Sequence, residues 1–417
     1  MRQSLLRWVG VTGRSVGPPG RCPWLYWLLL LICSHARPAA AQLAVSGTVR
    51  DSLTRQPLPF ASVFLATTTY GTTTDAQGHF QLAGLPKGTY ALTASYLGYA
   101  LRQRPVVLPG ESLPVELLLP AASQTLAEVV VRPHPHHAED YARFLELFLG
   151  TSTRAKQCRM RNPAVIQLDY DSGQNVLAAT ITAPLEIDNV ALGYRLTCYD
   201  LTFRADFRTH TTSSLSQLAF RPLPAGAAHQ RRWAAARQRA YRGSLMHFLR
   251  AVVTNTVAGE GFEVQRLRRV VNQRHVVADS IWQTILAGTK PGEQALMPDS
   301  IQRRRREPAQ YAYLFTPLLD PPSYRATRGG RTWLRFADLL AITYPSGQPD
   351  ANYQELALTL TPGRELTAVL HVTTPPEAEL EASGVPRQPD ALLGEGYWSF
   401  LQLADLLPLD YQPVLTP

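Results

Sequence analysis

The residues best suited to chemistry are a histidine and a glutamate three positions apart. His136 and Glu139 have the HxxE spacing of two zinc ligands, which in a zinc peptidase act with a distant histidine and leave one position open for water. The pair lies in a proline-rich stretch, residues 132–137, and at the start of an expected helix rather than on a buried sheet edge. No α/β pattern long enough for such a catalytic domain follows it. The sequence therefore predicts no peptidase activity.

A second hypothesis concerns the same proline-rich stretch. His134, His136 and His137 could form a metal site of another kind, and the alternative is a solvated linker. Elsewhere the sequence contains no nucleophile elbow, HExxH pair, phosphate-binding glycine loop or dinucleotide fingerprint. We therefore predict that the protein is not an enzyme, with no catalytic, cofactor-binding or metal-ligating residues and no cofactor.

The N-terminus has the pattern of a secretory signal peptide. Four arginines precede an apolar run of 11 residues, WLYWLLLLICS at positions 24–34, and three alanines follow at positions 39–41. The run is shorter than the roughly 18 residues of a membrane-spanning helix. We predict that residues 1–41 are removed before Gln42, that the protein is exported, and that the mature chain has no transmembrane span.

Export changes the interpretation of charge. The leader holds five of the 41 basic residues and none of the 32 acidic ones, so the mature net charge is +4 rather than +9. Between positions 207 and 259 there are eight arginines and no acid, and positions 303–306 are four consecutive arginines. Such surfaces bind anions by releasing counterions, and the alternative is a solvated helix face with an exposed loop. The weak candidates for an anion-binding surface are Arg231, Arg232, Arg239 and Arg250. Exported proteins rarely meet nucleic acid, so we predict no nucleic-acid partner.

Two cysteines remain after the leader is removed. Cys158 and Cys198 would both lie in an oxidising compartment. They are a candidate disulfide, and the alternative is two separate buried thiols.

Short β segments separated by turns run from Leu43 to Val131. Strand patterns occur at positions 44–49, 60–66, 79–82, 89–96 and 115–119, and such regular spacing is typical of a β-sandwich or barrel. We expect Asp75 to bond backbone amides of its own turn. The side chains expected in the core between the sheets are Phe60, Val63, Phe80, Tyr90 and Leu92.

These segments carry a family resemblance. The matching residues are Val45-Ser46-Gly47-Thr48-Val49, Asp51, Pro57-Leu58-Pro59, Ala61-Ser62-Val63, Gly71-Thr72-Thr73-Thr74-Asp75, Gly78-His79-Phe80, Gly88-Thr89-Tyr90, Tyr96-Leu97-Gly98-Tyr99 and Leu126-Ala127-Glu128-Val129-Val130-Val131. Together they resemble the carboxypeptidase-regulatory-like domain of secreted gram-negative envelope proteins. The resemblance implies a seven-stranded, transthyretin-like (prealbumin-like) β-sandwich that is an accessory module and not itself catalytic.

The rest of the chain has mixed signals. Apolar residues at positions 141, 144, 145 and 148 predict a helix ended by Gly150. Positions 231–253 predict the longest helix, and alternating residues at 356–360 and 366–372 predict a hairpin. The sequence therefore predicts a mainly β protein: a signal peptide (1–41), a sandwich (42–131), a linker (132–137) and a β-rich α+β region (138–417). This last region resembles a recurring extension of the same secreted proteins, which brings no known activity.

Three functions remain open. The first is a non-catalytic exported envelope protein, in the periplasm or at the outer membrane and cell surface, that binds a protein or a surface polymer. The second is an accessory component of a TonB-dependent outer-membrane transport system. The third is an enzyme of unrecognised type.

Overall fold

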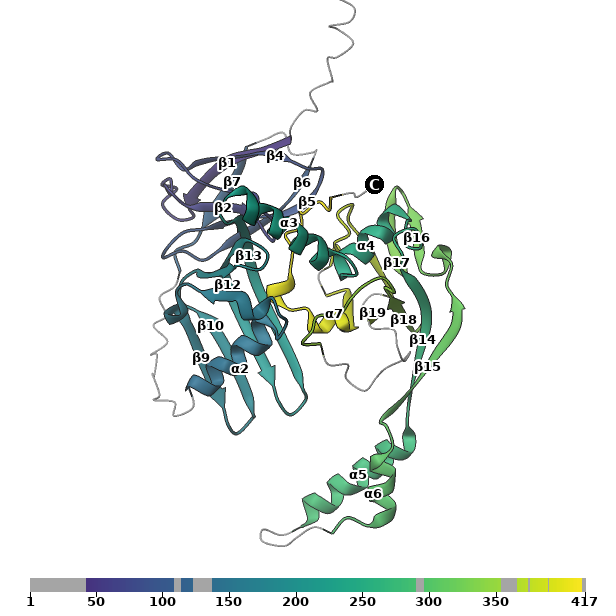
Figure 1. Cartoon of the computed structure of the whole chain (residues 1–417). Coiled ribbons are helices and arrows are strands. Elements are labelled where there is room, and N and C mark those ends of the chain that lie inside the picture. The colour runs from purple at the N-terminus through teal and green to yellow at the C-terminus, as the bar shows by residue number, and fades with distance from the viewer. Residues whose placement is uncertain are drawn as a thin grey trace, which may run out of the picture. The chain divides into compact units, whose positions relative to one another are not determined.

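In the computed structural model, the described residues are 43–108, 114–122, 137–289, 296–353, 366–373, 376–388 and 390–414. The predicted signal peptide and residues 132–136 of the predicted linker lie outside them, and His137, the last residue assigned to the linker, is the first residue of helix α2. The residues from Leu43 to Pro417 form one structural unit. Strands predominate over helices (Figure 1), so the predicted mainly β class is confirmed.

The N-terminal part is a sandwich of seven described strands. Three form the sheet β4-β1-β7 and four form the sheet β3-β2-β5-β6. The strands are β1 Leu43–Asp51, β2 Ser62–Leu65, β3 Gly71–Thr73, β4 His79–Leu85, β5 Gly88–Ser95, β6 Arg102–Leu108 and β7 Val115–Leu119. Their inward side chains form one core, in which Val49, Val63 and Leu92 are fully buried. The predicted seven-stranded sandwich is therefore confirmed.

Two local predictions in the sandwich had different outcomes. Asp75 accepts hydrogen bonds from the backbone N–H groups of Gln77 and His79 at 2.9 and 2.8 Å, as expected of a turn carboxylate. Phe60 is 74% exposed, so the prediction that it lies in the core is wrong. It precedes β2 with a positive φ of 59°, so the chain turns there and the ring points out of the sandwich.

The chain continues into a six-stranded sheet covered by a helix. The order is β8-β11-β12-β10-β9, with β13 also paired to β12. The elements are α2 His137–Leu149, β8 Cys158–Met160, β9 Ile166–Asp171, β10 Val176–Ile181, β11 Leu185–Asn189, β12 Tyr194–Asp206 and β13 Thr211–Pro222. Phe144 of α2 packs edge-on against Phe203 of β12 with ring centroids 5.1 Å apart. Gly150 has a φ of 95°, which confirms the predicted end of α2.

The expected long helix at 231–253 is two helices. These are α3 Ala227–Tyr241 and α4 Leu245–Thr254. Gly243 has a φ of 74°, and Ser244 accepts a hydrogen bond from the N–H of His247. A left-handed glycine ends a helix and a serine N-cap begins one. The apolar stripe of the sequence therefore continues across a break between α3 and α4.

A second core lies beneath α4. Its sheet has the order β15-β14-β18-β19-β21, beside a three-stranded sheet β16-β17-β20. The strands are β14 Glu263–Val271, β15 Gln310–Leu318, β16 Arg325–Arg328, β17 Arg331–Arg335, β18 Leu339–Thr343, β19 Thr367–Val372, β20 Glu377–Leu380 and β21 Leu392–Gly396. The predicted strand at 366–372 is β19, but β19 pairs with β18 on one side and with β21 on the other, so it is not the second arm of the predicted hairpin. The predicted first arm, residues 356–360, lies outside the described residues. Trp398 of the short helix α7 (Tyr397–Phe400) is buried in this core.

Three charged groups meet on the five-stranded sheet. Glu395 forms ion pairs with His371 at 2.6 Å and with Arg269 at 2.5 Å. The contact with His371 is the largest cause that lowers the pKa of Glu395 to about 2; burial opposes it, and the contact with Arg269 adds to the lowering. The cluster joins β14, β19 and β21 across the sheet.

Between β14 and β15 the chain forms a helical pair. Helix α5 spans Gln273–Gly288 and α6 spans Asp299–Arg306. Strand β18 pairs only with the first half of β14, from Glu263 to Leu267. The remainder of β14 and β15 is a two-stranded ribbon that leads to α5 and α6 (Figure 1).

Backbone hydrogen bonds join the sandwich to the six-stranded sheet. The N–H of Thr67 donates to the carbonyl of Leu218, and the N–H of Phe220 donates to the carbonyl of Thr68. The C-terminal segment adds a third bond, from the N–H of Leu409 to the carbonyl of Thr67. The loop after β2 is therefore held by β13 and by the C-terminal segment.

Candidate functional site

A cationic pocket lies between α3, the turn after β11 and the loop after α2. Its volume is about 460 Å³, within the range of small-molecule sites. The lining residues are Thr153, Arg154, Gln157, Val190, Ala191, His229, Arg232, Trp233, Ala235, Ala236 and Arg239. Three arginines and a histidine face a cavity whose described lining contains no aspartate or glutamate. This composition favours an anionic ligand.

Helix α3 supplies the largest wall. His229, Arg232, Ala236 and Arg239 recur at helical spacing and therefore share one face. Arg232 and Arg239 are exposed, and at 1.5 Å per residue their Cα atoms lie about 10 Å apart along the axis. The helix contains no acidic residue, so nothing within it neutralises this face.

Two side chains attach α3 to the turn after β11. The indole N–H of Trp233 donates to the carbonyl of Val190 at 2.8 Å. The guanidinium of Arg237 donates to the carbonyls of Leu192 and Gly193 at 2.7 and 3.0 Å, and lies 3.9 Å from the centroid of the Tyr194 ring. Arg237 therefore supports the pocket wall and does not line the pocket.

Gly193 is required at this turn for two reasons. Its φ is 69°, a conformation that other residues adopt with strain. A Cβ atom at this position would lie 2.1 Å from Cδ2 of Trp233. The close approach of the indole to the turn therefore depends on glycine.

Arg154 is held from behind by a buried carboxylate. Its Nη1 donates to Oδ1 of Asp405 at 2.7 Å, and the two side chains are 18% and 1% exposed. Burial raises the pKa of Asp405, and the guanidinium of Arg154 opposes that rise. Asp405 is not among the residues that line the pocket, so the arginine presents charge to the pocket while its partner lies behind it.

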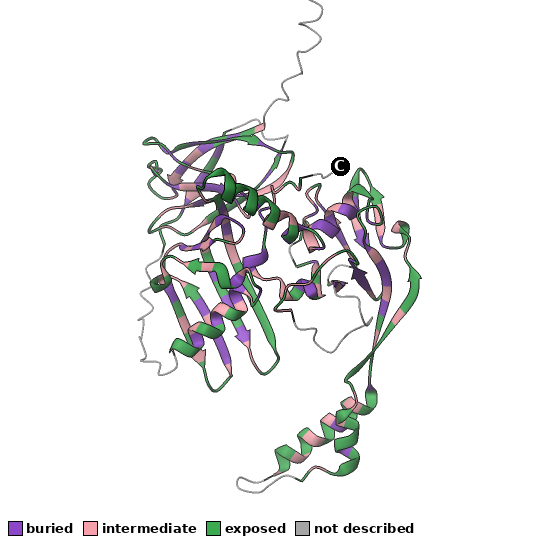
Figure 2. Cartoon of the chain, in the orientation of Figure 1, coloured by how far each residue is buried: buried purple, intermediate pink, exposed green. Residues whose placement is uncertain are grey.

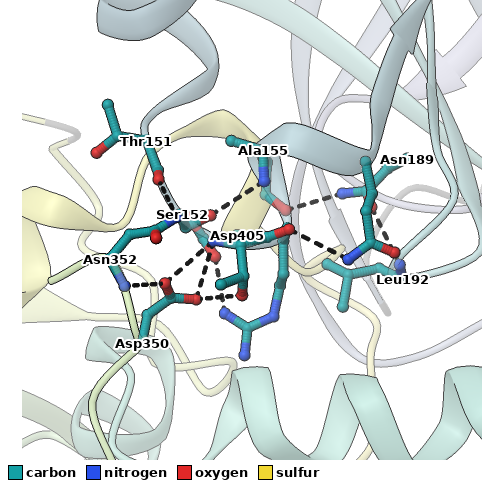
Figure 3. Close-up of polar contacts among 12 residues, drawn as sticks. Thr151, Ser152, Ala155, Asn189, Leu192, Asp350, Asn352 and Asp405 are labelled. Atoms are coloured by element: carbon teal, nitrogen blue, oxygen red, sulfur yellow. Dashed lines mark hydrogen bonds and ion pairs between the residues drawn. The ribbon is translucent and has the colours of Figure 1, made fainter.

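The loop that carries Arg154 is fixed on both sides (Figure 3). Ser152 accepts a hydrogen bond from the N–H of Ala155 at 3.1 Å, and the carboxylate of Asp350 accepts bonds from Thr153. Asn352 donates to the carbonyl of Thr151 at 2.8 Å. Chain segments nearly 200 positions apart thus meet at one loop.

Asn189 joins the turn after β11 to the C-terminal segment. Its Oδ1 accepts from the N–H of Leu192 at 3.0 Å, and its Nδ2 donates to the carbonyl of Ala404 at 2.8 Å (Figure 3). The same segment contains Asp405. One short stretch therefore positions both the turn and Arg154, which pre-organises two walls of the pocket.

The structure separates the four arginines singled out from the sequence. Arg232 and Arg239 line the pocket, and Arg231 is exposed outside its lining. Arg250 is engaged elsewhere: its guanidinium donates to the carbonyls of Ser383, Leu409 and Tyr411. Its donors hold the C-terminal segment against α4, so Arg250 is not available to an anion.

Sequence reasoning missed Arg154, His229 and Trp233. Arg154 lies in a loop without a local motif, and its partner Asp405 is 251 positions away. His229 and Trp233 could have been found from the spacing of α3, because His229 lies three positions before Arg232 and Trp233 lies four positions after His229.

The candidate disulfide does not form in this structure, where both cysteines are free. Cys158 pairs with Asn189 on one side of β11, and Cys198 pairs with Leu185 on the other side. Two strand spacings and four residues of rise put them on the order of 16 Å apart, far beyond the Cα separation of a disulfide. Burial raises the pKa of each thiol to about 12.

Other candidate sites receive no support from the described residues. Among them there is no group of three or more His, Cys, Asp or Glu side chains that could hold a metal ion. His134 and His136, and the side chain of His137, lie outside what is described. None of the described helices is both long and apolar enough to cross a membrane.

Comparison with known proteins identifies the sandwich. Residues 45–131 match the family described as the CarboxypepD_reg-like domain, which confirms the resemblance found in the sequence. The chain has no match among curated proteins. One similar solved structure is a Bacteroides fragilis protein of unknown function, described as membrane-associated. It is 12% identical, with 86% of this chain and 97% of that chain covered and a TM-score of 0.17. At that score the likeness supports no conclusion about this chain.

Proposed function

We propose that this chain, which carries a CarboxypepD_reg-like domain at residues 45–131, is a non-catalytic binding module of the cell envelope. In this proposal the protein is exported, the sandwich is a structural support, and the cationic pocket binds acidic groups of a surface polymer. The single observation that carries the proposal is the pocket lined by Arg154, Arg232 and Arg239 without a described carboxylate.

A supporting role for the sandwich agrees with its polar groups. The carboxylate of Asp51 accepts bonds from the N–H groups of Leu53 and Thr54 and from the hydroxyl of Tyr99. Asp75 is likewise occupied by its own turn. Carboxylates whose acceptors serve the local fold are poorly placed for chemistry, so we assign the sandwich no ligand.

The layout of the pocket supports a binding role over catalysis. Among the described lining there is no carboxylate or thiol, and His229 is its one histidine. General acid–base or nucleophilic chemistry needs an activated pair of groups within hydrogen-bond reach. Guanidinium groups instead recognise carboxylate or phosphate through charge-assisted hydrogen bonds.

The spacing of the arginines supports a polymer over a single small anion. Arg232 and Arg239 lie about 10 Å apart along α3, and both are exposed. Two cations at that separation contact two acidic groups of one chain more readily than one group. We therefore propose a polymer with repeated carboxylate or phosphate groups.

Equilibrium binding tests this function directly. Residues 42–417 would be titrated with fluorescent polygalacturonate, which carries carboxylates, with polyphosphate, and with neutral dextran. We expect at least one polyanion to bind and dextran not to bind. Affinity should fall as salt rises, with a slope of about −2 in log K against log salt for two neutralised arginines. Equal binding of dextran, or no binding of either polyanion at low salt, would overturn the proposal.

A further inference from the structure

Strand β15 is an open sheet edge. It pairs with β14 on one side, and no described strand pairs with its other side. Its nine residues, QYAYLFTPL, include no charged side chain, and none is fully buried. Figure 2 shows β15, α5 and α6 mostly in the exposed colour. Sheet edges in stable proteins are usually shielded by charges, prolines, bulges or covering segments. Pro317 and a register shift opposite residues 265–267 interrupt the far end of β15. The stretch at residues 310–314 keeps a regular register and has no charge, so this part of the edge favours a partner strand.

The register identifies the free backbone groups. The N–H of Asn272 donates to the carbonyl of Ala309 at 2.9 Å, which makes these two a hydrogen-bonded pair of the ribbon. Such pairs alternate along an antiparallel ladder with pairs whose N–H and C=O groups point away from each other. The outward-pointing groups of β15 are therefore those of Gln310, Ala312 and Leu314.

One face of the ribbon carries aromatic rings. Tyr311, Tyr313 and Phe315 alternate along β15 and are 40%, 54% and 40% exposed. Val270 lies opposite Tyr311, and Arg268 lies opposite Tyr313. A shallow depression of about 540 Å³ lies over this face, between Arg268 and Phe315. Tyrosine and arginine are enriched at protein-binding surfaces, where they supply much of the binding energy.

The two arginines of this face differ in their partners. Arg266 forms an ion pair with Asp338 and lies 4.9 Å from the centroid of the Phe315 ring. Arg268 is exposed and has no hydrogen bond or ion pair with any described residue. Among the described residues, the face therefore presents one positive charge without an acidic partner, beside two exposed tyrosines.

We propose that β15 is a docking edge for an extended, acidic segment of a partner protein. The segment adds a strand against Gln310–Leu314, and an acidic side chain pairs with Arg268. A second copy of this chain would bring another Arg268 rather than a counter-charge. Lipid chains cannot bond the open backbone groups. An acidic β-strand can bond the open backbone groups, pack side chains on the aromatic face and pair with Arg268 at the same time.

The test uses two capped seven-residue peptides on the mature chain. One alternates valine with glutamate, and its matched control alternates valine with lysine. We expect the glutamate peptide to bind and to slow hydrogen exchange at residues 310–314, while the lysine peptide does neither. The slowing of hydrogen exchange at residues 310–314 should persist in R232E/R239E, which separates this edge from any binding of the same peptide at the cationic pocket. Failure of the glutamate peptide to bind, or equal binding of both, would overturn the proposal.

Two substitutions test the strand geometry and the charge separately. Ala312→Pro removes an outward N–H without breaking a bond to β14, and should weaken binding of the glutamate peptide at least tenfold. Ala312→Val keeps the N–H and should change affinity less than threefold. Arg268→Glu should make the protein bind the lysine peptide more tightly than the glutamate peptide. This test of charge remains valid even if the proline variant folds poorly. If the wild-type protein forms a dimer that Ala312→Pro abolishes, the edge binds a second copy of this chain. If the wild-type protein binds vesicles and Arg268→Glu abolishes that binding, the edge binds lipid. Either result would refute the proposal.

Discussion

The ion pair between Arg154 and Asp405 is the most direct point at which to perturb the pocket. The two groups are 2.7 Å apart and 18% and 1% exposed, so neither is well solvated when its partner is removed. Loss of one partner of a buried pair costs about 3–5 kcal/mol. Because Arg154 borders a pocket that water can enter, we place Asp405→Ala at about 2–3 kcal/mol and Arg154→Ala at a similar cost.

A double-mutant cycle measures the pair itself. The double variant leaves no unpaired charge, so its cost should be about 2 kcal/mol less than the sum of the two single costs. Urea unfolding of the four proteins, followed by circular dichroism, gives these values. The matched control is the surface pair Arg50–Glu116, which is 3.7 Å apart and 34% and 50% exposed. We expect a coupling below about 0.5 kcal/mol there. An equally small coupling between Arg154 and Asp405 would show that the carboxylate does not hold the arginine in place.

Three further predictions concern stability and reactivity. Gly193→Ala should destabilise the protein by at least about 2 kcal/mol, because the added Cβ meets the ring of Trp233; an unchanged urea midpoint would contradict this. Glu395 has a lowered pKa, so its contribution to stability is present above its unfolded pKa of 4.5 and is lost as pH falls toward about 2. The stability difference between wild type and Glu395→Gln should therefore shrink by about 1 kcal/mol between pH 5 and pH 2.5, after allowance for solvent screening, and a constant difference would exclude it. Thiol titration of the denatured, unreduced protein should find Cys158 and Cys198 both free, and both should react slowly in the native state; a monomer with no free thiol would reverse this conclusion.

Features that depend on neighbours in sequence were predictable. Asp75 and Gly150 behave as expected because a turn carboxylate and a helix-ending glycine act within a few residues. The break between α3 and α4 was missed although Gly243 and Ser244 are visible in the sequence, since the apolar stripe continues across them. Phe60 was misplaced because a positive φ reversed the direction of its side chain.

Features that depend on distant segments were not predictable in the same way. Half of the cationic pocket follows from the spacing of Arg232 and Arg239, which one helix fixes. The other half depends on Arg154, whose position is set by Asp405 and by Asp350 across the fold. Likewise, the open edge of β15 follows from sheet order and not from the local sequence.

The affinity of charge-reversed variants for a polyanion shows whether the cationic pocket is the binding site. The variant R232E/R239E changes two pocket arginines, and R303E/R304E makes the same change in charge on α6, outside the pocket. Titrated with the polyanion that binds wild type more tightly, R232E/R239E should lose at least tenfold in affinity, while R303E/R304E should stay within threefold. Equal losses in the two variants, or a larger loss in R303E/R304E, would show that anions are held by general surface charge and would contradict the account.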